Sequence, residues 1–226
     1  LVQTGSAYRW DNRLLADTAK ENADWMVGVC TLDPSSSESV AELERLVTGY
    51  NVRGVRIEPT RSDYPQYYHP GSVALWEAAQ RLDVVICAHL QVRYLKQLSE
   101  LLARFPDVPV VLDHAAYPKA ADGVDSETVR AVVDLARFGQ LNVKLTFTVT
   151  GSEEAYPFSD MHGIVRVLLD AYGPERCMWG SDFPCEHWLK KASYARHLDL
   201  FRREMGLSDA EQSAILSETA ARLWFP

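Results

Sequence analysis

Three short apolar runs in this sequence each end in a side chain that can exchange a proton or bind a metal ion, namely His89, His114 and Asp182. A carboxylate near an imidazole can act as a general base on water. The alternative is structural, since a strand-end histidine can be a hydrogen-bonded core residue and Asp182 could cap a helix. Because such side chains recur at one end of successive runs, we predict a shared site.

Two basic residues occupy comparable positions. Arg56 lies near the end of one apolar run, and Lys144 shares an alternating face of another run with Asn142 and Thr146. A guanidinium binds a carboxylate through two parallel hydrogen bonds, whereas an ammonium acts as a point charge. Arg56 and Lys144 could therefore hold an anionic substrate. Alternatively, Arg56 pairs with Glu58, and Lys144 extends its charged end towards water.

A third candidate is the segment Tyr64–Pro70, which combines aromatic and polar residues. Binding residues are common on loops that a rigid scaffold positions. We expect Tyr67 or Tyr68 to stack on a bound ligand, with a plain surface loop as the alternative.

The runs that carry these residues are continuous stretches of apolar and β-branched residues, a pattern typical of parallel strands buried on both faces. Helical patterns separate them, so strand–helix units recur every ~25–35 residues. We predict strands at Leu1–Thr4, Trp25–Leu32, Val52–Ile57, Val84–His89, Val108–His114, Leu141–Thr148 and Cys177–Asp182. We predict helices at Asp11–Asn22, Ser37–Gly49, Gly71–Leu82, Val92–Phe105, Ser126–Phe138, Phe158–Tyr172, Glu186–Met205 and Ser208–Leu223, the last starting with a capping box.

This alternation predicts an α/β fold, namely a single-domain (β/α)₈ TIM barrel over residues 1–226 that lacks its first strand. The alternative is a doubly wound open sheet, for which no glycine-rich nucleotide-binding fingerprint is present. Chemistry in such barrels takes place where the carboxyl ends of the strands meet, which is where the polar residues fall. Because the sequence begins inside an apolar run, we expect further residues to precede Leu1.

Composition narrows the class of function. The chain has 23 basic and 31 acidic residues, a net charge of −8, and no Lys/Arg-rich run, which argues against a general nucleic-acid binder. No stretch approaches the ~20 apolar residues that span a bilayer. The four cysteines form no C-x-x-C pair, so we expect reduced, buried thiols. We expect a cytoplasmic protein with a small, anionic substrate; a homo-oligomer is left open.

Several segments resemble the amidohydrolase superfamily over essentially the whole chain. The most specific is Trp-Gly-Ser-Asp-Phe-Pro within Gly173–Pro184, and Val108–His114 and Leu141–Thr146 agree with it. Gly54–Ile57 and Ile215–Leu223 also match. More narrowly, the chain resembles the amidohydrolase-related (amidohydrolase 2) branch, which includes hydrolases similar to 2-pyrone-4,6-dicarboxylate lactonase.

The resemblance implies a distorted (β/α)₈ barrel with a His-x-His motif on the first strand. It further implies histidines after strands five and six, matched by His89 and His114, and an aspartate after strand eight, matched by Asp182. These three residues would then bind a divalent metal, for which zinc is the first candidate. No His-x-His motif occurs in this sequence, and some relatives work without metal. In that mode Asp182 activates water and His114 polarises the scissile carbonyl.

The function that the resemblance implies is hydrolysis of a small carboxylated lactone or related ester, with Arg56 and Lys144 on the substrate carboxylate. Tyr117 departs from a His-x-x-Arg-Pro pattern of such lactonases, so the dicarboxylate substrate does not carry over directly. One alternative is a metal-dependent decarboxylase of the same branch that uses the same positions. Another is an inactive or truncated barrel without enzymatic activity.

Overall fold

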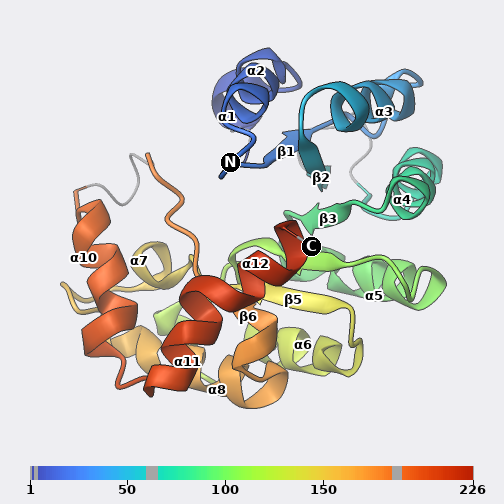
Figure 1. Ribbon diagram of the computed structural model, residues 1–226. Helices are drawn as coiled ribbons and strands as arrows, with labels where there is room; N and C mark the ends of the chain where they lie inside the picture. Colours follow the sequence, from blue (N-terminus) through green and yellow to red (C-terminus); the bar gives the residue numbers. More distant parts are fainter. Residues whose placement is uncertain (1, 3–4, 60–65, 185–189, 226) are drawn as a thin grey trace. The chain divides into compact units, whose positions relative to one another are not determined.

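The computed structural model describes residue 2 and residues 5–59, 66–184 and 190–225 (Figure 1). The chain divides into two compact units, Leu1–Val111 and Leu112–Pro226, which we call unit 1 and unit 2. The division falls within strand β4 (Val110–Leu112). The single domain expected from the sequence therefore stays a prediction, and each unit is described by itself.

Unit 1 is built on three parallel strands. The central strand β2 (Val52–Ile57) pairs with β1 (Gly28–Thr31) on one side and with β3 (Val85–Ala88) on the other. All residues of β1 and β3 are buried, as expected for strands covered on both faces. Helices pack along the strands: α2 contacts β1, α3 contacts β2, and α4 contacts β2 and β3. The helices of unit 1 are α1 (Gly5–Tyr8), α2 (Arg13–Glu21), α3 (Ser39–Gly49), α4 (Pro70–Leu82) and α5 (Leu95–Arg104) (Figure 1).

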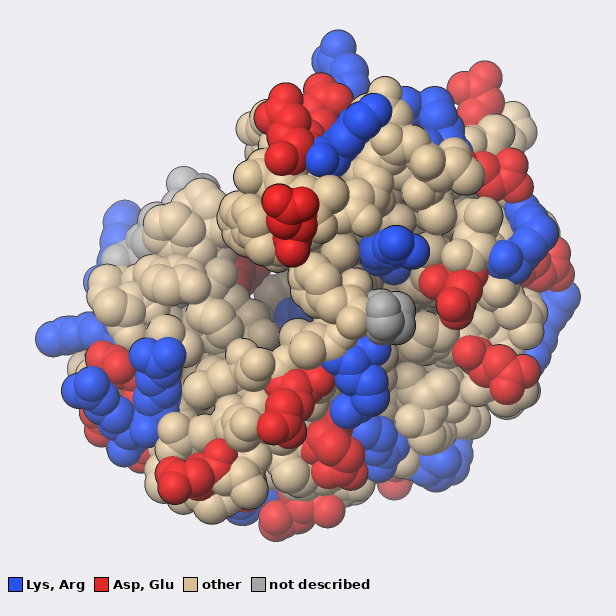
Figure 2. Space-filling view, in the orientation of Figure 1, with Lys and Arg blue, Asp and Glu red and all other residues tan. Residues whose placement is uncertain are grey.

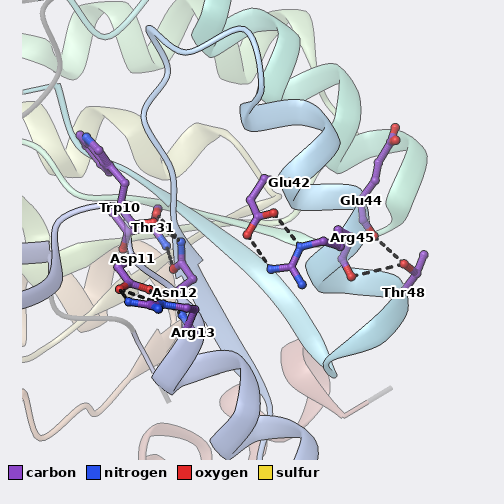
Figure 3. Close-up of polar contacts among 9 residues, drawn as sticks. All are labelled: Trp10, Asp11, Asn12, Arg13, Thr31, Glu42, Glu44, Arg45 and Thr48. Atoms are coloured by element: carbon purple, nitrogen blue, oxygen red, sulfur yellow. Dashed lines mark hydrogen bonds and ion pairs between the residues drawn. The ribbon is translucent and has the colours of Figure 1, made fainter.

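The edge of β1 that faces away from β2 is occupied by a side chain. The backbone N–H of Leu32 donates to the carbonyl oxygen of Arg56 in β2. Because successive residues of a strand direct their N–H and C=O groups to alternate edges, those of Thr31 point away from β2. There the Asn12 amide accepts from the Thr31 N–H at 2.9 Å and donates to the Thr31 carbonyl at 3.0 Å (Figure 3). Val2 bridges Val29 in parallel on the same edge. Asn12 thus bonds to this strand as a neighbouring strand would.

Unit 2 contains the parallel pair β5 (Leu141–Lys144) and β6 (Cys177–Met178), in which Val143 lies opposite Cys177. Its apolar core gathers between the strands and the helices, with α6 packed on α8 and α12 on β6. Among the described residues, the α-helices of this unit are α6 (Glu127–Asp134), α7 (Thr148–Gly151), α8 (His162–Tyr172), α10 (Tyr194–Asp199), α11 (Asp209–Ser213) and α12 (Thr219–Trp224) (Figure 1). The predicted capping box is confirmed, because Ser208 and Glu211 bond reciprocally at the start of α11.

Some predicted boundaries were wrong. Strand β5 ends at Lys144 rather than Thr148, and a short helix begins at Thr148, because only Leu145 N continues to bond to β6. Helix α10 begins at Tyr194 rather than Glu186, because Ser193 caps it by accepting from Arg196 N. Residues 185–189, including Cys185, lie outside the described residues, as do Leu1, Gln3 and Thr4 of the first predicted strand.

On the face drawn in Figure 2, acidic and basic side chains are interspersed, and neither sign forms a continuous field. Within the described part of the chain, no helix has both the length and the apolar character needed to cross a membrane.

Candidate functional site

Unit 1 holds a polar cluster at the carboxyl ends of β2 and β3. The backbone N–H of His89 donates to Ile57 O at 3.2 Å, which brings the residues after the two strands together. His89 Nδ1 then lies 2.7 Å from Glu58 Oε1, and Arg56 Nη1 lies 3.7 Å from the same oxygen. The Glu58 side chain is only 1% exposed. Arg56 therefore pairs with Glu58, which is the alternative that the sequence left open.

Glu58 determines which nitrogen of His89 carries a proton. An ionised carboxylate accepts hydrogen bonds and cannot donate, so Nδ1 of His89 must be protonated to make the 2.7 Å contact. In the neutral ring, the lone pair then lies on Nε2. Sequence reasoning did not include Glu58 in the candidate site. Its position directly after an apolar strand, like that of the other candidates, was the available signal.

Tyr67 and Tyr68 are hydrogen-bonded to side chains of helix α5. Their backbone N–H groups both donate to Gln97 Oε1, at 2.6 and 2.8 Å. Tyr67 is fully buried. The Tyr68 hydroxyl accepts from Arg104 Nη1 at 3.3 Å, at the end of α5. Stacking of either ring on a ligand stays a prediction.

Unit 2 holds a second polar cluster, which starts where β4 ends. His114, Ala115, Ala116 and Tyr117 all have positive φ, between 48° and 66°, so the chain makes a left-handed turn of four non-glycine residues. That conformation costs roughly 1–2 kcal/mol per residue. The turn stacks the His114 ring on the Tyr117 ring, with centroids 4.7 Å apart and 20° between the planes. The His114 side chain is thereby fixed in one plane.

The polar face of β5 reaches the residues after β4. Thr146 Oγ1 lies 2.6 Å from His114 Nδ1, and both residues are buried. Lys144 Nζ forms an ion pair with Asp113, whose carboxylate is fully buried. The alternating Asn142, Lys144 and Thr146 face was predicted, whereas its partner Asp113 was not assigned a role.

Asp182 lies beyond the end of β6, on a segment that approaches β5 closely. A Cβ added to Gly180 would lie 2.8 Å from Thr146 Cγ2 and 3.1 Å from Lys144 Cδ. Glycine is therefore needed where this segment passes the cluster. Asp182 itself is exposed and has a positive φ of 49°. An exposed carboxylate of this kind is accessible to water.

The structure thus groups the predicted residues into two sets. Arg56 and His89 lie in unit 1 with Glu58, whereas His114 and Lys144 lie in unit 2 with Asp113 and Thr146. Within the described ranges, no group of three or more His, Cys, Asp or Glu side chains could hold a metal ion. His89 of the predicted ligand set belongs to unit 1, and His114 and Asp182 belong to unit 2, so a metal centre on these three residues stays a prediction.

Comparison with protein families gives a match to the family described as Amidohydrolase over residues 2–225. The chain is 33% identical over 205 residues to an L-fucono-1,5-lactonase from Burkholderia multivorans, covering 84% of this chain and 67% of that protein. It is 29% identical over 178 residues to the corresponding lactonase from Burkholderia ambifaria, covering 77% and 60%. A 4-sulfomuconolactone hydrolase from Rhizobium radiobacter is 28% identical over 184 residues, covering 77% and 57%. The chain thus spans about three fifths to two thirds of the length of these relatives.

Solved structures agree with this result. A Pseudomonas putida protein described as a 2-pyrone-4,6-dicarboxylic acid hydrolase has a TM-score of 0.84 at 25% identity, covering 99% of this chain and 80% of that one. An amidohydrolase from Burkholderia multivorans with bound zinc has a TM-score of 0.78 at 28% identity, covering 93% and 77%. The predicted resemblance and the α/β fold class are both confirmed.

Proposed function

This chain belongs to the amidohydrolase family, and on that premise we propose that it hydrolyses the ring ester of a small lactone. The observation that carries the proposal is the polar cluster of unit 2. There His114 is hydrogen-bonded to Thr146, Lys144 is paired with Asp113, and the segment that leads to Asp182 passes close to both Thr146 and Lys144. The relatives named as lactonases and as a lactone hydrolase support the same chemistry.

In the proposed reaction, Asp182 accepts a proton from water as the water oxygen bonds to the lactone carbonyl carbon. An N–H of His114 donates to the carbonyl oxygen, where negative charge develops. The tetrahedral intermediate then collapses, the ring C–O bond breaks, and the proton held by Asp182 passes to the leaving alkoxide. The product is the open-chain hydroxy acid, and both carboxylate and imidazole return to their starting states.

We further propose that the substrate is an anion that Lys144 binds. An ammonium has three donors, so Lys144 can keep its bond to Asp113 and still donate to a substrate carboxylate. In unit 1, Arg56 is paired with Glu58, and its role as a carboxylate-binding residue stays a prediction. Two of the relatives are named for substrates that carry carboxylate or sulfonate groups.

The metal that a related structure contains is not assigned to this chain. His89 could bind an ion only through Nε2, because Glu58 occupies Nδ1, and His114 could do so only through Nε2, because Thr146 occupies Nδ1. Because His89 belongs to unit 1 and His114 and Asp182 belong to unit 2, a divalent ion on these three residues stays a prediction. No step of the proposed reaction passes through a metal.

Decarboxylation by the same residues is the second candidate. The decarboxylase structures that the chain resembles are 15–18% identical to it, so they show a shared fold and support no decarboxylase activity. We therefore favour hydrolysis.

The test is a pH-stat screen of the purified chain against neutral and carboxylated lactones, including L-fucono-1,5-lactone and 2-pyrone-4,6-dicarboxylate. We expect acid release above the buffer rate, and Arg56→Met should raise KM for the carboxylated substrate more than for the neutral one. Asp125→Asn, an exposed carboxylate in a loop of unit 2, serves as the control and should match the parent. Absence of acid release from every lactone would contradict the proposal.

A further inference from the structure

The hydroxyl of Thr146 can bond to His114 in two ways, and these place the imidazole proton on different nitrogens. If Thr146 donates, Nδ1 carries the lone pair, and the proton of the ring lies on Nε2. If Thr146 accepts, Nδ1 carries a proton. The proposed reaction needs an N–H that can donate to the substrate carbonyl, so the direction of this bond matters.

The surroundings of Thr146 decide between the two. Its side chain is buried at 3% exposure, and its hydroxyl has a hydrogen bond to His114 Nδ1 and to no other atom of the described residues. If the hydroxyl accepted from Nδ1–H, its own proton would be buried without an acceptor, which is the costly outcome for a buried donor. If it donates, the buried hydroxyl proton has Nδ1 of His114 as its acceptor. The buried hydroxyl therefore favours donation to Nδ1.

We propose that Thr146 is a positioning residue that holds His114 as the Nε2–H tautomer, ready to donate to the lactone carbonyl. The inference rests on the proposed function for its catalytic consequence. The stack on Tyr117, with centroids 4.7 Å apart, fixes the plane of the ring, and Thr146 selects the nitrogen that donates. Glu58, which can only accept, imposes the opposite tautomer on His89. The two histidines are thus prepared for different roles.

The chain offers a matched control two residues away. Thr148 is fully buried, and its hydroxyl has no hydrogen-bond partner among the described residues. Thr146→Val and Thr148→Val make the same change of one hydroxyl for one methyl at buried positions. Only the first removes a bond to His114.

The experiment is ¹⁵N NMR of histidine-labelled protein as purified, with His114→Gln used to assign the His114 signals. We expect the parent, Thr146→Ser and Thr148→Val to show a protonated Nε2 and an unprotonated Nδ1 at His114. In Thr146→Val the preference should weaken to a mixture. A proton on Nδ1 in the parent overturns the proposal, as does a Thr146→Val spectrum identical to that of the parent.

Kinetics provide the second readout. Thr146→Val should lower kcat by about tenfold, the value of one hydrogen bond, with KM changed less than about twofold. Thr146→Ser should restore kcat, and Thr148→Val should leave it unchanged. A chain without lactone turnover would overturn the proposed function alone, because the NMR result decides the tautomer independently. Should Thr146→Val fail to fold, the parent and Thr146→Ser spectra still decide.

Discussion

The ion pair between Lys144 and Asp113 joins a partly exposed ammonium to a carboxylate with no exposure at all. Burying a charge is costly unless a partner compensates it. Removal of the Lys144 ammonium therefore leaves the buried Asp113 carboxylate without this compensating charge. We expect Lys144→Met to lower the free energy of unfolding by about 3–5 kcal/mol. The double variant Asp113→Asn/Lys144→Met should be less destabilised than Lys144→Met alone.

Urea unfolding of the parent, Lys144→Met, Asp113→Asn and the double variant measures the coupling energy between Lys144 and Asp113. The control is Arg45→Met, which breaks an exposed ion pair to Glu42 and should cost under about 1 kcal/mol. Equal losses in Lys144→Met and in the double variant would show that the Asp113 charge is not compensated by Lys144.

His197 is a second buried ionisable residue, packed among the rings of Trp179 and Phe201 with centroids 5.7 and 6.1 Å away. Burial lowers the pKa of His197 to about 4, from an ordinary value of 6.5. The unfolded chain therefore binds a proton more readily than the folded one, and stability is lost as the pH falls from 6.5 towards 4. At pH 4, the lowered pKa of His197 reduces the free energy of unfolding by about 3 kcal/mol relative to neutral pH.

We expect His197→Phe to reduce the dependence of the unfolding free energy on pH between 6.5 and 4, while carboxylates contribute equally to parent and variant. Urea midpoints at half-unit pH steps measure this. Parallel profiles for the two proteins would mean that His197 does not take up a proton on unfolding.

At the scale of the element, the bonds from Asn12 to Thr31 complete the edge of β1 (Figure 3). Asn12→Ala removes one donor and one acceptor from a strand residue that is fully buried, and we expect a loss of about 1–3 kcal/mol in the free energy of unfolding. Asn12→Asp keeps the acceptor for Thr31 N–H but buries a carboxylate oxygen against the Thr31 carbonyl, so it should lower the free energy of unfolding at least as much as Asn12→Ala. The control is Thr48→Ala, an exposed position on α3, which should stay within about 0.5 kcal/mol of the parent.

Element positions were predictable where the signal is local. The range Val52–Ile57 for β2 was confirmed without change, and the capping box from Ser208 to Glu211 is a pattern over four residues. The start of α10 was missed because Ser193 caps the helix inside a run that reads as helical throughout.

The candidate site was predictable only in part. Apolar runs that end in polar residues indicate strand ends, which placed His114 and Lys144 correctly after β4 and on β5. Their partners could not be predicted from spacing, since the Thr146–His114 and Lys144–Asp113 contacts join residues 32 and 31 positions apart. Such pairings depend on strand register, which a single sequence does not contain.

At the scale of the whole molecule, the cysteines report on both units. Cys30 and Cys87 are buried in unit 1, and Cys177 is buried in unit 2, where burial raises the pKa of its thiol to about 12. A thiol that is buried and protonated does not react. We expect these three cysteines to resist alkylation in the native protein. If the chain is a single domain, all three should become reactive at the same urea concentration. Mass spectrometry measures the alkylation of each cysteine as a function of urea concentration. Separate transitions for Cys87 and Cys177 would contradict the single-domain prediction.

In the proposed reaction, Asp182 activates water for attack on a lactone carbonyl. The most direct measurement is hydrolysis in H₂¹⁸O of a lactone that the chain turns over, with the product followed by mass spectrometry. We expect one ¹⁸O in the product carboxylate, formed about 10²–10⁴-fold more slowly by Asp182→Asn, which is the usual cost of losing a general base. Product without ¹⁸O, or labelling by Asp182→Asn at the rate of the parent, would contradict it.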